Sequence, residues 1–117
     1  MKAIPKSMLQ QEGRLMGTIT DGWTTSEPEI LAELKNIRIE PSSKVIRDKN
    51  NVEWQLAAVL FFDCKNSSPK GTVFHEDQVV DFQGERFRII SVEPLYDKRR
   101  LHHYEIGMVR YAGKSKG

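Results

Sequence analysis

The strongest constraint on the fold of this chain is an apolar run from Trp54 to Phe62 with a repeat of two residues. A repeat of two is the period of a β-strand, whose successive side chains point to opposite faces. One face would then carry Trp54, Leu56, Ala58, Leu60 and Phe62. The other face is also apolar from residue 57 onward, which predicts a strand at the centre of a sheet or one covered by another subunit.

Several further segments have the same character, with turn-forming residues between them. Residues 14–20 alternate weakly before Asp21-Gly22, and a turn cluster occupies residues 48–51. Residues 30–40 are predicted as a strand that ends at Pro41. Within residues 28–34, however, the apolar spacing also fits the first turns of a helix, and both interpretations stay open at this point.

The C-terminal third predicts a β-hairpin, because Gln83-Gly84 separates two strand-like segments, residues 79–82 and 85–92. Gly84 can adopt the positive φ that a two-residue hairpin turn requires. The prediction is specific, because it places one residue type at one turn position.

A β-bulge near Ile90-Ser91 is predicted as well, since it would return Val92 to the core face. Pro94 and the charged loop 97–100 should end this strand, and a last strand is expected over residues 101–111. Five or six short strands with tight turns predict a mostly β domain, an antiparallel barrel or a small sandwich, with long loops and room for one short helix.

The length of 117 residues fits a single domain. Residues 1–12 are predicted as a flexible arm or short helical turn, and residues 113–117 as a frayed basic tail. The net charge of +2 is too small to indicate nucleic-acid binding by itself. Cys64 is the single cysteine, so the chain forms no internal disulfide. Without an apolar segment of the ~20 residues that span a membrane, or a signal-peptide pattern, we expect a soluble protein made in the cytoplasm.

The residues that could carry chemistry do not form a recognisable site. Cys64, His75, His102 and His103 are the metal-binding candidates, but no C-x-x-C or H-x-x-x-H spacing is present. His102 and His103 are adjacent in a predicted strand, so we expect their side chains to lie on opposite faces. Cys64 with a histidine and Asp63 is the only nucleophile–base combination, and no glycine-rich turn presents it. The sequence therefore predicts no metal, no cofactor and no catalytic residue.

A nucleic-acid-binding barrel is the alternative function that the residues support best. Arg86 and Arg88 share one face of a predicted strand, and the basic loop 98–100 follows Tyr96. Small barrels bind single strands through such basic surfaces combined with stacked aromatic rings. The aromatic residues of the neighbouring strands fall on the predicted core faces, however, which leaves few rings for stacking.

Five blocks of the sequence, taken together, resemble a known family. The blocks are NIRIEP (36–41), LFFDC (60–64), NSSPKG (66–71), VEPLYD (92–97) and LHHYEIG (101–107). Their residues and spacing are similar to those of minor capsid or head-closure (head completion, connector) proteins of tailed bacteriophages and of prophages in Gram-positive bacteria. The likeness covers residues 35–110, which is most of the chain.

The resemblance implies a virion structural protein of the head–tail connector, built as a small SH3-like barrel with long loops. Such proteins form a homo-oligomeric ring beneath the portal and adaptor, close the DNA-filled head and provide a docking surface for tail proteins. Packaged DNA would pass nearby without sequence-specific recognition, and no membrane is involved. The expected locations are the virion and, during assembly, the cytoplasm of the bacterial host. The resemblance implies neither enzyme activity nor a cofactor, and the isolated subunit can be a monomer.

Two polar loops are the candidate assembly interface of such a ring. Their residues are Asn66, Ser67, Ser68, Pro69 and Lys70 in one loop, and Asp97, Lys98, Arg99 and Arg100 in the other. The loop over residues 66–71 is expected to serve assembly and not folding, because it is too polar for a core and can reach a neighbour from an anchored base. A plain solvent-exposed loop is the alternative.

Overall fold

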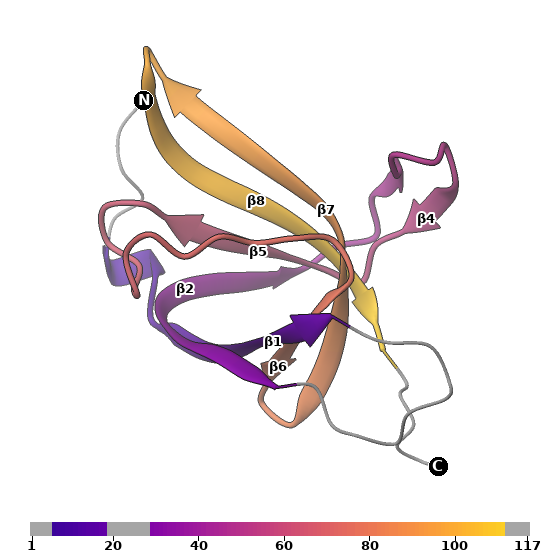
Figure 1. The fold of residues 1–117 in the computed structure, drawn as a ribbon, viewed down its shortest axis with the longest axis horizontal. Helices are drawn as coiled ribbons and strands as arrows, with labels where there is room; N and C mark the ends of the chain where they lie inside the picture. The colour runs from indigo at the N-terminus through magenta and orange to yellow at the C-terminus, as the bar shows by residue number, and fades with distance from the viewer. Residues whose placement is uncertain (1–5, 19–28, 112–117) are drawn as a thin grey trace.

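The computed structural model describes residues 6–18 and 29–111, which form eight β-strands and one short 3₁₀ turn (Figure 1). The elements in chain order are η1 (Lys6–Met8), β1 (Gln11–Thr18), β2 (Ile30–Pro41), β3 (Val45–Arg47), β4 (Glu53–Gln55), β5 (Ala58–Asp63), β6 (Gln78–Phe82), β7 (Glu85–Asp97) and β8 (Arg100–Arg110). Six strands close into an antiparallel barrel in the order β1-β2-β5-β8-β7-β6, while β3 and β4 pair with each other. The predicted mostly β antiparallel barrel is confirmed.

The barrel encloses one apolar core, because its strands direct alternate side chains inward. Strand β5 is the clearest case: Ala58, Leu60 and Phe62 are buried, while Val59 and Phe61 are half-buried. It lies between β2 and β8, which agrees with the prediction of a central strand. The core consists of Leu15, Leu34, Ile37, Ile39, Ala58, Leu60, Phe62, Phe74, Val80, Phe87, Ile89, Ile106 and Met108.

The prediction of one strand over residues 54–62 is wrong in one respect, because the structure divides this run into β4 and β5. The chain changes partners at Leu56, whose N–H donates to the carbonyl of Lys44 at 2.8 Å. Trp54 pairs with Ile46 across the separate β3–β4 hairpin. Since Leu56 is still buried, the repeat of two residues continues through the break and conceals it in the sequence.

The predicted hairpin between β6 and β7 is confirmed. Gln83 and Gly84 form its turn with φ angles of 53° and 80°, the two positive values of a type I′ turn. The predicted bulge is also present, because the pairing of β7 with β8 shifts between Ile89 and Ser91. Beyond this bulge Val92 packs against the core, as expected.

Strands β7 and β8 continue beyond the barrel as a two-stranded hairpin, at the upper left of Figure 1. The prediction that Pro94 ends the strand is wrong, because β7 runs on to Asp97 and Pro94 pairs with Tyr104 of β8. Strand β6 pairs with β7 only over residues 85–88, so the outer part of β7 is an edge within the described chain. Edge positions tolerate the missing N–H of a proline.

The helical alternative for residues 28–34 is also wrong, because β2 begins at Ile30 as a strand. It pairs with β1 up to Ile37 and with β5 from Arg38 onward. Asn36, with a φ of 57°, lies at this change of partner. The antiparallel pairing of residues 30–37 with β1 outweighs the weak helical spacing of the apolar residues.

Part of the predicted N-terminal arm belongs to the fold. Gln11 and Glu12 are the first residues of β1, and Leu9 is buried. Residues 1–5 of the arm, the predicted tail at 113–117 and the Asp21-Gly22 turn lie outside the described residues.

Candidate assembly surface

The loop after β5 is attached to the barrel by hydrogen bonds centred on Ser67. Ser67 is 1% exposed, and its hydroxyl donates to the carbonyl oxygen of Asn36 at 2.5 Å. The same hydroxyl oxygen accepts the N–H of Asp63 at 2.9 Å. Ser68 adds two backbone hydrogen bonds with Lys35. The base of this loop is therefore part of the fold, and Ser67 is not accessible to a partner.

Only the outer part of this loop is exposed. Lys70 and Gly71 are exposed, whereas Asn66 and Ser68 are half-buried. The Lys70 ammonium group donates a hydrogen bond to the carbonyl oxygen of Lys65, which folds the lysine back over the loop. The surface available for assembly is thus narrower than the segment expected from the sequence.

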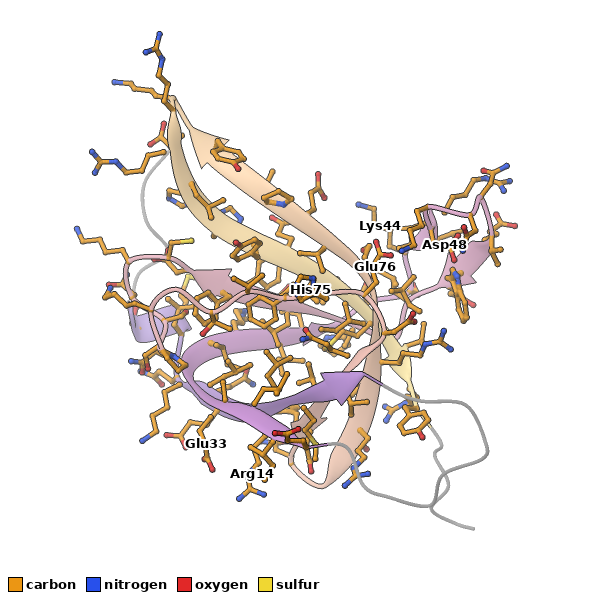
Figure 2. The ribbon with its side chains drawn as sticks, viewed as in Figure 1. Arg14, Glu33, Lys44, Asp48, His75 and Glu76 are labelled. Atoms are coloured by element: carbon orange, nitrogen blue, oxygen red, sulfur yellow. The ribbon has the colours of Figure 1, made fainter. Side chains whose placement is uncertain are left out.

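The second candidate segment forms the tip of the β7–β8 hairpin. Strand β7 ends at Asp97 and β8 begins at Arg100, so Lys98 and Arg99 make up the whole turn, with a φ of 62° at Lys98. All three cations of this tip are exposed, and Asp97 is half-buried. The side chains at the tip end in nitrogen atoms that point away from the barrel (Figure 2).

The structure brings the two candidate segments together. A groove of about 1090 Å³ separates the start of the loop from the hairpin, with Asp63, Cys64 and Lys65 on one side and residues 97–102 on the other. The pairing of β5 with β8 places these segments side by side. The groove is therefore a product of the barrel topology and not of any local motif.

The exposed cations of this groove are not neutralised by ion pairs with other described residues. Lys65, Lys98, Arg99 and Arg100 form no ion pair within the described residues. Like charges gathered on a projecting surface attract a partner of opposite charge and raise the rate of association with it. The groove and tip are thus suited to an anionic surface.

A family model for minor capsid proteins matches residues 16–108, which include both candidate loops and the groove between them. The chain belongs to the minor capsid protein family. This membership confirms the resemblance found in the sequence and supports a structural role in a phage particle. No curated protein and no solved structure matches the chain.

In this minor capsid protein, three aromatic rings pack the base of the β7–β8 hairpin. The Phe74 ring centroid lies 5.3 Å from that of Phe62 and 5.6 Å from that of Tyr104, both in edge-to-face geometry. Burial raises the pKa of Tyr104, and the neighbouring Cys64 and Tyr96 add to the effect. The phenol is therefore neutral near pH 7 and serves packing.

His102 and His103 do not lie on opposite faces, which corrects the sequence prediction. Their Nδ1 atoms are 2.7 Å apart. The pairing of β7 with β8 shifts between Leu95 and Tyr96, so that His102 is the extra residue of a β-bulge. A bulge changes the direction of its side chain, which turns His102 toward His103. His103 is buried, and its Nε2 lies 3.1 Å from a carboxylate oxygen of Glu105.

Cys64 is half-buried, and burial raises the pKa of its thiol. A protonated thiol is a poor nucleophile and a poor metal ligand. Across residues 6–18 and 29–111, no group of three or more His, Cys, Asp or Glu side chains is placed to hold a metal ion. The described part of the chain also contains no helix that is both long and apolar enough to cross a membrane.

The arginines expected to form a nucleic-acid surface have carboxylate partners. Arg88 donates to one oxygen of Asp77 from Nη2 at 2.9 Å and from Nε at 3.1 Å. Its guanidinium carbon lies 5.6 Å from the ring centroid of Trp54. Arg86 lies 4.0 Å from Asp81. The arginines on this strand face therefore take part in a network of ion pairs and one cation–π contact that joins β6, β7 and the β3–β4 hairpin.

Sequence reasoning missed the β3–β4 hairpin, which projects from the barrel at the right of Figure 1. Asp48 in its turn accepts a hydrogen bond from the indole of Trp54 at 2.9 Å, and the Lys49 ammonium lies 3.3 Å from a carboxylate oxygen of Glu76, in the loop before β6. Figure 2 labels Asp48 and Glu76. The turn cluster at 48–51 between two short apolar segments was the available signal, and it could have predicted this hairpin.

Proposed function

We propose that this protein is a non-enzymatic structural subunit of the head–tail connector. A ring of copies would close the DNA-filled head beneath the portal and adaptor and offer a docking surface to tail proteins. Family membership supports the structural role in the phage. The observation that carries the finer proposal is the long β7–β8 projection of a closed barrel, whose tip bears three exposed cations with no ion pair among the described residues.

A closed barrel suits a subunit of this kind because its strands pair in a cycle. Such a barrel offers little free edge for strand addition, so its neighbours are contacted through projections. The two projecting hairpins also carry exposed apolar side chains: Val45 and Val52 on β3–β4, and Tyr96 on β7–β8. Apolar groups within a polar rim are the usual composition of a protein–protein contact.

Complementation of a phage with an inactivated gene tests this proposal. Wild-type protein is compared with a tip variant, Lys98→Ser/Arg99→Ser/Arg100→Ser, and with a control, Lys44→Ser, which removes an exposed cation beside β3. Electron microscopy then scores tails and packaged DNA. We expect untailed or leaking heads without the gene and with the tip variant, and normal particles with the control. Normal tailed particles in the absence of the protein would overturn the connector role.

The loop after β5 can be tested separately from folding. Replacing residues 69–71 with Ser-Gly shortens the exposed part and retains the hydrogen bonds of Ser67. We expect an unchanged melting temperature together with fewer tailed particles. A normal yield of tailed particles would show that the loop is a plain solvent-exposed segment.

The second candidate is a nucleic-acid-binding barrel, which is favoured by the basic tip and by Tyr96, 56% exposed, two residues before the turn. Stacked rings beside cations are the common means of binding single strands. Fluorescence anisotropy with a labelled single-stranded oligonucleotide distinguishes the two functions. Tight binding that falls steeply with salt, and that the tip variant loses, would favour this second function.

A further inference from the structure

We propose that copies of this protein contact each other head to tail, with the basic tip of one β7–β8 hairpin seated in an acidic groove of the next copy. The inference rests on the proposed function, because it names the contact from which a ring would be built. It commits to a second copy of this chain as the partner.

The acidic groove lies where β1, the first half of β2 and the β6–β7 turn meet. It has a volume of about 330 Å³ and is lined by the carboxylates of Glu12, Glu33 and Asp81 and by one guanidinium, that of Arg14. Arg14 and Glu33 are 3.6 Å apart with both side chains more than half exposed, and exposed pairs of this kind interact weakly. Asp81 lies 4.0 Å from Arg86, and Glu12 has no ion pair within the described residues, although exposed Lys35 is its partner across the β1–β2 pairing. The residues that line the groove itself therefore carry three carboxylates against one guanidinium, with Arg86 and Lys35 beside them.

The hairpin tip complements this groove in both shape and charge. Lys98 and Arg99 form a turn of two residues at the end of a two-stranded ribbon, and Arg100 follows directly. The tip is a narrow projection, whereas the groove is a concave surface. The three cations of the tip form no ion pair in the described chain, and in the proposed contact they face the three carboxylates and one guanidinium that line the groove of the next copy. A charged contact of this kind selects its partner by sign.

Apolar groups lie beside both charged surfaces. Tyr96 is 56% exposed near the tip. Leu31 is 49% exposed on β2, two positions before Glu33, at the register shift where Ala32 pairs with Leu15 and Ile30 pairs with Met16. An exposed ring and an exposed aliphatic side chain next to opposite charges fit a protein partner better than a phosphate backbone.

The two surfaces lie at opposite ends of one copy. The hairpin tip is at the top of the view in Figure 1, and Arg14 and Glu33 of the groove are at the bottom of the same view in Figure 2. The tip of a copy therefore does not reach its own groove, and each copy can contact one neighbour at each end. Contacts between two different surfaces generate a ring when the rotation from each copy to the next closes into a circle, and a filament when it does not.

Charge reversal on each surface tests this contact in the purified protein. One variant reverses the tip, Lys98→Glu/Arg99→Glu/Arg100→Glu, and a second reverses the groove, Glu12→Lys/Glu33→Lys. A matched control, Lys44→Glu, reverses an exposed cation outside both surfaces. Sedimentation velocity over a concentration series, at low and high salt, measures self-association, and circular dichroism checks the fold of each variant.

We expect wild type and control to associate at low salt and to dissociate as salt rises. Each reversed variant alone should associate at least about 10-fold more weakly, because like charges face each other. A mixture of the two variants should associate again, since each tip then meets a groove of opposite charge. A wild-type protein that is monomeric at every concentration, or a mixture that does not recover, would overturn the proposal.

Disulfide cross-linking keeps the test decisive if a reversed variant fails to fold. In a Cys64→Ala background, a Lys98→Cys chain is mixed with a Gln83→Cys chain, and Lys44→Cys replaces Lys98→Cys in the control. Oxidation should link the tip chain to the groove chain and leave the control pair unlinked. Equal yields for both pairs would contradict the contact, as would oligonucleotide binding without self-association. If the purified protein does not self-associate but the phage still needs its gene to form tailed particles, only the head-to-tail contact fails and the connector role stands.

Discussion

The hydroxyl of Ser67 donates a hydrogen bond of 2.5 Å to the carbonyl oxygen of Asn36, more than thirty positions earlier in the chain. Asn36 lies where β2 passes from its pairing with β1 to its pairing with β5. The bond therefore ties the loop after β5 to the point at which β2 changes partner. The N–H of Asp63 donates to the same hydroxyl, so that one buried side chain holds three segments.

Replacement of Ser67 by alanine should destabilise the barrel. The change removes the donor to Asn36 and the hydroxyl that accepts the buried N–H of Asp63, and loss of a buried hydrogen-bond partner costs about 1–3 kcal/mol. The urea midpoint of unfolding measures this loss. Ser68→Ala is the matched control and should change stability by less than about 0.5 kcal/mol, because the Ser68 hydroxyl forms no hydrogen bond within the described residues. Equal effects of the two substitutions would contradict the role of Ser67.

Gly84→Val should weaken the β6–β7 hairpin. Gly84 has a φ of 80°, and no atom lies within 4 Å of the position that a Cβ would take, so the expected cost of about 1–2 kcal/mol comes from backbone strain alone. Gln83→Asn should have the opposite sign, because asparagine tolerates the φ of 53° at this position better than glutamine. Denaturant midpoints compare the two variants. An unchanged midpoint for Gly84→Val would show that the turn contributes no strain.

Gly107 is required for a different reason, which is close packing. A Cβ at Gly107 would lie 2.8 Å from the hydroxyl of Ser91 and 3.0 Å from a methyl group of Leu56. Gly107→Ala should therefore cost about 1–3 kcal/mol from overpacking. Addition of Ser91→Ala removes the nearer atom and should recover part of the stability. Thermal melts of both variants check this, and a double variant no more stable than the single one would place the clash elsewhere.

The β3–β4 hairpin should respond to acid through Asp48. Hydrogen bonds from the Trp54 indole and from the Val52 N–H lower the pKa of Asp48 below its ordinary value of 3.8. A lowered pKa means that the folded hairpin favours the carboxylate. Its contribution is complete above the ordinary value and is lost as the pH falls through the lowered one.

The indole N–H resonance of Trp54 measures this acid transition, with Trp23→Phe removing the second tryptophan signal. We expect the resonance to shift toward that of a free indole below about pH 4, which is the ordinary range of an aspartate. Asp48→Asn should abolish this titration. A transition that persists in Asp48→Asn would assign it to another group.

The parts of the fold that were predictable from sequence are those set by local rules. The Gln83-Gly84 turn needs positive φ angles, and the bulge before Val92 follows from the need to keep apolar residues on one face. The alternation in residues 30–40 also indicated a strand correctly. Each of these features depends on residues that are neighbours in the chain, so their signal is complete within a short segment.

The errors arose where distant segments decide the outcome. Pro94 is accommodated in β7 because β6 has already ended, and His102 turns toward His103 because the register with β7 shifts. Ser67 looked like a loop residue because its partner, Asn36, lies on another strand. The groove between the loop and the hairpin tip has the same origin, since the pairing of β5 with β8 creates it.

The β7–β8 hairpin has a mechanical consequence, because its two strands are the same strands that close the barrel. Within the barrel β7 also pairs with β6, and β8 also pairs with β5. Antiparallel hydrogen bonds run perpendicular to the strands. A pull on the tip along the hairpin axis therefore loads many of these bonds together in shear, instead of opening them one after another. The resistance of the projection to tension is therefore set by the hydrogen bonds that join β7 and β8 to their neighbours in the barrel.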